Sequence, residues 1–215
     1  MSRIQFYCCF FVLLVSCTHQ PGESIHSGHK KAIKIEKAVI IDCHYSFEEA
    51  VKGSNAPKEI IDQLKLINVQ YYSTDHKIHQ GQVLANVQIT DKIEILFKYI
   101  LCHKFPIAHA IPIVKYNWDD DLSMQSNNTY SFCYRDISFS KHAYGMAIDI
   151  NPYFNPERWK AGHENRADKP SGAHYDPNVP STFYKLHPVV QALKKLGFFW
   201  GHNFTAKYDD HHFEI

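Results

Sequence analysis

The chain has 215 residues, 45% hydrophobic and 14% aromatic, which is enough to bury one substantial core. Its 23 basic and 22 acidic residues leave a formal net charge of +1 without a basic stripe, which argues against an electrostatic binder of nucleic acids. Fifteen histidines make a single histidine uninformative, so only spacing and context can indicate a site.

The N-terminus has the features of a bacterial export signal. An apolar run from Phe6 to Val15 follows Arg3 and is too short for a mature membrane-spanning helix. It ends in Leu14-Val15-Ser16-Cys17, which resembles a lipobox. We therefore expect a signal peptide over residues 1–16 and a lipid on Cys17 that anchors the protein to a membrane of the bacterial cell envelope, facing the periplasm. An ordinary secretory signal with a coincidental cysteine is the alternative.

Three cysteines remain after such a cleavage, Cys43, Cys102 and Cys133. An odd number in an exported protein allows one disulfide and one free thiol, or no disulfide. The chain has no C-x-x-C pattern, so a thiolate zinc site is not expected.

Residues 18–31 are polar and resemble a tether, and residues 32–45 suggest a strand in an extension that reaches to residue 56. The main domain is expected over 57–215. Pro57 suits the first turn of a helix that we expect to continue through Leu66.

Further along, strands are expected at residues 68–73 and 81–89, around a turn at residues 79–81. Thr90 is a plausible N-cap for a helix with one apolar face, formed by Ile93, Leu96, Phe97, Ile100 and Leu101. Residues 111–116 suggest a strand, and residues 188–196 suggest a helix that stops at Gly197. Helices and strands without regular alternation indicate an α+β domain, with a mainly antiparallel sheet and flanking helices.

The stretch "SKHAYGMAIDINP", residues 140–152, places polar groups on a buried scaffold. On a strand, Ile148 and Ile150 face one side and Asp149 the other. Gly145 permits a tight turn, so that His142 folds back beside Asp149. An imidazole and a carboxylate are ordinary zinc ligands.

The last residues, "YDDHHFEI", supply a third ligand. Phe213 and Ile215 are expected to point inward, with His212 and Glu214 on the opposite face. His142, Asp149 and His212 then form a three-ligand centre with an open fourth position, which is typical of catalytic zinc.

These motifs resemble the zinc D-alanyl-D-alanine carboxypeptidase and L-alanoyl-D-glutamate endopeptidase family, over about residues 57–215. The motif S-x-H-x-x-G-x-A-x-D is met at Ser140, His142, Gly145, Ala147 and Asp149, and an acid three residues before a histidine is met at Asp209 and His212. The resemblance implies the fold shared by these peptidases and hedgehog-type domains, one Zn²⁺ per chain, and hydrolysis of a peptidoglycan stem peptide by a metal-activated water. The bond is one cut by a D,D- or L,D-carboxypeptidase or by an L-Ala-D-Glu endopeptidase.

The resemblance also implies roles for other residues. Asp209 is expected to handle the proton, with Glu214 as the alternative base, although we favour Glu214 as a support for a metal ligand. Arg135 is expected to hold the oxyanion or a substrate carboxylate, with a surface salt bridge as the alternative. Ser140 either bonds to substrate or caps its turn. His202 and His211 depart from the family pattern, and neither is expected to touch a ligand.

Two functional classes follow from these patterns. The favoured one is an envelope metallopeptidase, and the second is a zinc-containing lipoprotein that binds the cell wall without turnover. The absence of H-E-x-x-H and G-x-S-x-G excludes the common zinc-protease helix and the serine-hydrolase elbow. The polar stretch 156–180 is expected to form a cleft wall, with His163 and His174 at the surface.

Overall fold

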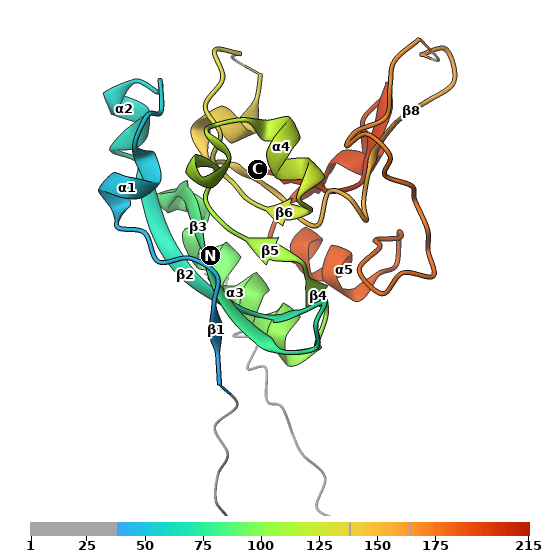
Figure 1. The fold of residues 1–215 in the computed structure, drawn as a ribbon. Helices are drawn as coiled ribbons and strands as arrows, with labels where there is room; N and C mark the ends of the chain where they lie inside the picture. The colour runs from blue at the N-terminus through green and yellow to red at the C-terminus, as the bar shows by residue number, and fades with distance from the viewer. Residues whose placement is uncertain (1–37, 138, 164) are drawn as a thin grey trace, which may run out of the picture. The chain divides into compact units, whose positions relative to one another are not determined.

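A computed structural model describes residues 38–137, 139–163 and 165–215 of the chain (Figure 1). The expected signal peptide, Cys17 and the tether lie outside these residues. In the described part, helices and strands are mixed without regular alternation, which confirms the α+β class. The strands form several small sheets rather than one.

The largest sheet is built on a long antiparallel ribbon. Its strand order is β1-β3-β2-β4, in which β2 and β3 pair antiparallel and the two short outer strands pair parallel to their neighbours. The four strands are β1 (Ile40–Ile41), β3 (Ile78–Asn86), β2 (Leu64–Ser73) and β4 (Pro106–Ile107).

Both faces of this ribbon are covered. Strand β2 contributes Ile67, Val69 and Tyr71 to the main core, together with the long helix α3 (Val87–Cys102). It contributes Leu64 to a second cluster beside α1 (Phe47–Val51) and α2 (Lys58–Ile61). Successive strand residues point to opposite faces, so one strand serves two apolar clusters.

The helix expected after Pro57 is shorter than predicted. It ends at Ile61, and the chain enters β2 at Leu64. The reason is the alternation of Leu64 and Leu66 with exposed Lys65, which suits a strand over an apolar cluster.

The turn expected at residues 79–81 lies earlier. The β2–β3 connection is closed by a hydrogen bond from Ser73 N to Lys77 O, and residues 79–81 lie within β3. The N-cap of α3 is Asn86 rather than Thr90, because the Asn86 side chain accepts a hydrogen bond from Gln88 N at 3.1 Å. Four of the five residues of the predicted face, Ile93, Leu96, Phe97 and Ile100, are buried, and Leu101 is half-buried.

The strand expected at residues 111–116 is wrong. Pro112 instead precedes a 3₁₀ turn, η1, and a short two-stranded parallel sheet flanks it. The elements of this middle region are β5 (His109–Ala110), η1 (Ile113–Tyr116), α4 (Asp120–Gln125) and β6 (Asn128–Thr129).

The C-terminal half forms two small antiparallel sheets. One has the order β7-β11-β9 and the other pairs β8 with β10. The strands are β7 (Ala147–Asp149), β8 (Glu157–Trp159), β9 (Phe199–Trp200), β10 (Lys207–Asp209) and β11 (His212–Glu214). The remaining elements are the 3₁₀ turns η2 (Lys141–Tyr144) and η3 (Gly201–Asn203) and the helix α5 (Pro188–Lys195).

The predictions for this half agree with the structure in their main points. Ile148, Ile150 and Phe213 are fully buried in the core, and Ile215 packs against it. Helix α5 buries Val189, Val190 and Leu193. The final stretch is not one strand, however, because a turn at residues 210–211 separates β10 from β11.

Residues before the expected domain start at Pro57 also pack on the domain. Strand β1 pairs with β3, and Ala50 of α1 is fully buried. Cys43 and Cys133 are free thiols, so they do not pair with each other. Among the described residues, no helix combines the length and apolarity that crossing a membrane requires.

Candidate metal centre and active-site cleft

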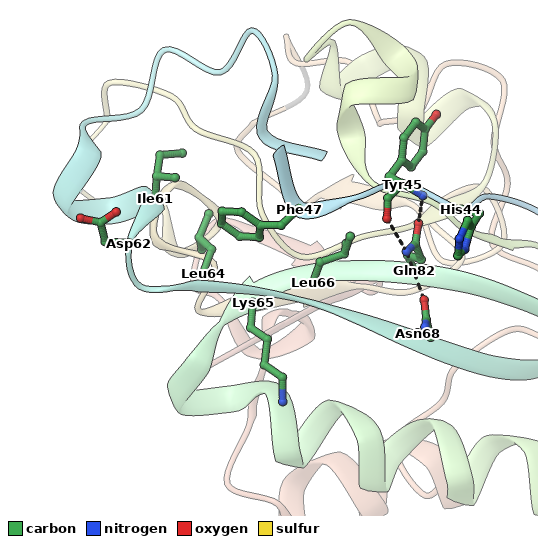
Figure 2. A pocket seen from close by; sticks show the side chains of 10 residues that line it. All are labelled: His44, Tyr45, Phe47, Ile61, Asp62, Leu64, Lys65, Leu66, Asn68 and Gln82. Carbon is green, nitrogen blue, oxygen red and sulfur yellow. Dashed lines mark hydrogen bonds between the residues drawn. The ribbon is translucent and has the colours of Figure 1, made fainter. Parts of the chain in front are cut away.

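Two cavities are candidate sites. The larger, about 570 Å³, lies between α1–α2 and the β2–β3 ribbon (Figure 2). Its apolar side chains include Phe47, Leu64 and Leu66, and the amide of Gln82 in its floor is bonded to Tyr45 and Asn68. It contains none of the residues that the sequence motifs indicated.

The second cavity, about 470 Å³, collects every residue that the sequence predicted for the catalytic and metal site. They come from five separate places in the fold, namely the segment before η2, η2 itself, β7, β10 and β11. The seven predicted residues that line it are Arg135, Ser140, His142, Asp149, Asp209, His212 and Glu214.

Three ligand atoms converge in this cleft. His142 Nε2 lies 3.0 Å from Asp149 Oδ1 and 3.0 Å from His212 Nδ1, and the remaining side of the triangle, from His212 Nδ1 to Asp149 Oδ1, is 2.9 Å. All three residues are buried. Zinc binds nitrogen and carboxylate oxygen at about 2.0–2.2 Å, so an ion slightly above the plane of this triangle can bond to all three atoms. The donor set therefore fits a zinc ion with one position left open.

Hydrogen bonds fix both histidines in the form that a metal requires. His142 Nδ1 donates to the carbonyl oxygen of Ser131 at 2.6 Å, which leaves the lone pair on Nε2 for the metal. His212 Nε2 lies 3.0 Å from Glu214 Oε2 and donates to it, which leaves Nδ1 for the metal. Partners of this kind orient the ring and raise its basicity.

The local backbone explains how His142 and Asp149 meet. η2 ends at Gly145, whose φ of 64° lies in the left-handed region. A Cβ at Gly145 would lie 2.8 Å from Asn86 N, so a side chain would not fit. Strand β7 then pairs with β11, with Asp149 directly opposite His212. The cross-strand pair thus supplies two ligands and the turn supplies the third.

Without a metal, the carboxylates and imidazoles stabilise each other's charges. Burial alone would raise the pKa of Asp149, but His142 and His211 hold it well below its ordinary value. Burial opposes protonation of His212, but hydrogen bonds with Asp149 and Glu214 raise its pKa to about 9. The hydrogen bond from His212 likewise lowers the pKa of Glu214.

Asp209 lies in the cleft as a buried carboxylate. Its Oδ2 is 2.9 Å from Lys207 Nζ, and its Oδ1 is 3.0 Å from His211 Nε2. The His211 contact is an ion pair without an aligned hydrogen bond, because Oδ1 has no hydrogen-bond partner. Although burial opposes ionisation, His211 and Lys207 lower the pKa of Asp209. Asp209 is therefore an ionised carboxylate with a free lone pair.

The expectation that His211 touches no ligand is wrong. His211 Nε2 lies 3.7 Å from Asp149 Oδ2, and its Nδ1 donates to Asn155 O at 2.8 Å. Burial opposes protonation, but Asp209 and Asp149 raise the pKa of His211 to about 10. Alternation along a single strand would turn His211 inward, away from the site. The turn at residues 210–211 breaks that alternation.

Arg135 and Ser140 also border the cleft. Arg135 Nη2 makes an ion pair with Asp120 Oδ2 at 2.8 Å. Asp120 and Lys207 were not anticipated as neighbours of the site, because nothing in their own sequence context marks them. Ser140 precedes η2, but its side chain makes no capping hydrogen bond, which removes the simpler of its two expected roles.

The polar stretch 156–180 contributes part of the cleft wall, as expected. Glu157 of β8 and Lys169 line the cavity. His163 and His174 do not line it, and His174 is exposed.

One comparison with known proteins covers the part of the chain that forms most of this site. Residues 135–215 match the family model described as D-alanyl-D-alanine carboxypeptidase, and the match contains both motifs and all seven predicted site residues. It confirms the resemblance for this part of the chain, whereas the likeness expected over residues 57–134 stays a prediction. Searches of curated proteins and of solved structures gave no match.

Proposed function

Residues 135–215 belong to the D-alanyl-D-alanine carboxypeptidase family, and on this premise we propose that the protein is a zinc peptidase of the bacterial cell wall. It hydrolyses an amide bond in the stem peptide of peptidoglycan, as a carboxypeptidase or as an endopeptidase. The observation that carries the proposal is the convergence of His142 Nε2, Asp149 Oδ1 and His212 Nδ1 within 3.0 Å of one another.

One Zn²⁺ held by His142, Asp149 and His212 would supply a Lewis acid and lower the pKa of a bound water toward about 7. The protein keeps these three side chains in place through Ser131, Glu214 and the β7–β11 pairing. Glu214 acts here as the partner of His212, because its Oε2 accepts the hydrogen bond from His212 Nε2.

Asp209 is the proton carrier in this proposal. It lies in the same cleft as the three ligands, it is ionised, and its Oδ1 has a free lone pair. A carboxylate in this state can accept the proton of the attacking water and then deliver it to the leaving amine nitrogen. Lys207 and His211 hold the carboxylate on both sides, so that it does not rotate away.

Arg135 supplies positive charge in the same cleft. Its guanidinium is oriented by Asp120, and a fixed cation can bind a developing oxyanion or a substrate carboxylate. Ser140 lines the cleft with an uncapped hydroxyl, which can bond to the peptide.

The enzyme is favoured over a cell-wall binding module by Asp209. A binding protein needs no buried, ionised carboxylate with a free lone pair beside a metal centre, because an unpaired buried oxygen is costly. A metal-binding lipoprotein without turnover remains the second candidate, and it makes a different prediction for Asp209.

The location is proposed from the lipobox-like residues Leu14-Val15-Ser16-Cys17. A lipid on Cys17 would anchor the domain in the envelope, within reach of stem peptides. Cys17→Ala should block processing or release a soluble protein, as seen by membrane fractionation. Membrane attachment of a fully processed Cys17→Ala protein would refute the lipid anchor.

The function is tested by incubating purified protein, lacking residues 1–17, with peptidoglycan and muropeptides and weighing the fragments. Loss of a terminal residue identifies a carboxypeptidase, and separation of the stem between L-Ala and D-Glu identifies an endopeptidase. Removal of the metal by a chelator should stop the reaction, and Zn²⁺ should restore it. Intact substrate in the presence of bound zinc would refute the proposal.

A further inference from the structure

Asp210 stands between the proposed base and the last metal ligand, and it is fully buried. It occupies the turn where the chain leaves one sheet, β8–β10, and enters the other, β7-β11-β9. Asp209 belongs to the first sheet and His212 to the second. The geometry of this turn therefore decides how the proposed base faces the metal ligands.

Three groups from three elements, β8, η3 and β9, hold Asp210. Its Oδ2 accepts from Arg158 Nη2 of β8 at 2.6 Å, and its Oδ1 lies 2.6 Å from His202 Nδ1 of η3. Its backbone oxygen accepts from Trp200 Nε1 of β9 at 2.9 Å. One residue thus bonds to both sheets at once.

Aromatic rings hold two of these partners, Arg158 and His202. The Arg158 guanidinium lies over the rings of Tyr175, at 4.3 Å, and Tyr208, at 5.2 Å. The His202 ring stacks on Trp200 at 4.4 Å and lies 4.8 Å from Tyr208. Both partners are therefore held in one orientation when they bond to Asp210.

η3 also presses directly on Asp209. A Cβ at Gly201 would lie 2.8 Å from Asp209 O and 2.9 Å from Asp209 Cβ, so only glycine fits. The segment that bonds to Asp210 through His202 is thus the same segment that packs against Asp209.

A buried ion pair of this kind is weak evidence for stability, since apolar side chains of similar volume often replace such pairs without loss. Its clearer effect is to specify one geometry. We propose that Asp210, clamped by Arg158 and His202, is a positioning residue that sets the Asp209 carboxylate against the centre formed by His142, Asp149 and His212. The expected effect on turnover rests on the proposed peptidase function. The expected effect on the metal's surroundings rests only on the geometry of the turn.

The test compares Asp210→Asn and the paired replacement Asp210→Leu with Arg158→Met, measured in the zinc-loaded protein. For both, kcat on muropeptides should fall about 10–100-fold with KM unchanged, as for loss of an outer support of a metal site. The urea midpoint of the paired variant should stay close to wild type. Arg158→Lys keeps the positive charge, so its kcat should fall less than that of the other two variants. Asp62→Asn, at an exposed residue directly after α2, is the matched control and should leave every value unchanged.

A second readout does not depend on turnover. With Co²⁺ in place of Zn²⁺, the visible absorption of the metal should shift in Asp210→Asn relative to wild type. If wild type cleaves nothing, the proposed function fails and this spectrum alone decides the inference. If Asp210→Asn does not fold, His202→Ala carries the same measurements, since that side chain is 32% exposed. Wild-type kcat and an unchanged cobalt spectrum, with only the urea midpoint lowered, would overturn the positioning role.

Discussion

His142 Nε2 and His212 Nδ1 lie 3.0 Å apart although 70 residues separate them in the chain. Two buried imidazole nitrogens at this distance, both facing the same carboxylate oxygen, need a proton or a metal between them. The hydrogen bonds to Ser131 and Glu214 direct both lone pairs to this point. A metal centre explains the arrangement.

The first prediction concerns the metal. His142→Ala and His212→Ala should each lose tight zinc binding, by more than the roughly 10–100-fold that loss of an outer hydrogen-bond partner costs. Competition with a chromophoric chelator measures the affinity. His174→Ala, at an exposed histidine outside the cleft, is the control and should bind one zinc per chain. Full, tight occupancy in both ligand variants would refute the assignment.

The second prediction distinguishes two roles for Glu214, as a support for the metal ligand His212 or as the general base. Glu214→Ala removes the acceptor of His212 Nε2 and should weaken zinc binding about 10–100-fold. Glu214→Gln, which keeps an acceptor oxygen, should lose less. Zinc affinity and turnover are measured on the same samples. Turnover lost at wild-type zinc affinity would instead make Glu214 the base.

Much of this site could be predicted from the sequence, because alternation assigns residues of a strand to faces. Asp149 and His212 were correctly placed opposite their apolar neighbours Ile148 and Phe213. The prediction that His211 touches no ligand is wrong, because the turn at residues 210–211 interrupts the strand alternation on which it rests. The contact between Arg158 and Asp210 spans 52 residues and has no local signal at all.

The errors in the fold have a similar cause. Leu64 and Leu66 were assigned to the preceding helix, because a short apolar run fits either period until its packing partners are known. Residues 111–116 have the β-branched content of a strand, but Ile113–Tyr116 forms a 3₁₀ turn after Pro112. At both places, packing in the folded protein rather than local propensity determines the secondary structure.

The third prediction concerns Arg135. Arg135→Ala should reduce kcat about 10²–10³-fold, the usual cost of a lost oxyanion donor, with zinc content unchanged. Arg135→Lys should recover little, because lysine lacks the planar fork of the guanidinium. Lys169→Ala removes another cation from the same cleft and serves as the comparison. Equal rates in Arg135→Ala and wild type would show that Arg135 only forms its salt bridge with Asp120 and has no role in hydrolysis.

The fourth prediction concerns acid stability and lies away from the metal. His187 caps α5 by accepting a hydrogen bond from Val189 N on Nδ1, and burial lowers its pKa to about 4. The unfolded value is about 6.5. The unfolded state therefore binds more protons between these values, and stability should fall as the pH drops from about 6.5 to 4.

The expected loss from His187 alone is roughly 2–3 kcal/mol between pH 7 and 4.5. His187→Asn keeps a neutral capping acceptor and should show a correspondingly flatter decline. Urea unfolding of both metal-free proteins at the two pH values measures the difference. Parallel declines in the two proteins would show that His187 does not contribute.

The role of Asp209 as the proton carrier is decided by Asp209→Asn on cell-wall muropeptides, with zinc content and hydrolysis rate measured on the same samples. Zinc content should equal that of wild type, because Asp209 is not a ligand. Hydrolysis should be slower by about 10²–10⁴-fold, the usual contribution of a general base, equivalent to roughly 2.7–5.4 kcal/mol of barrier. Hydrolysis at the wild-type rate by the zinc-loaded variant would show that Asp209 is not the base.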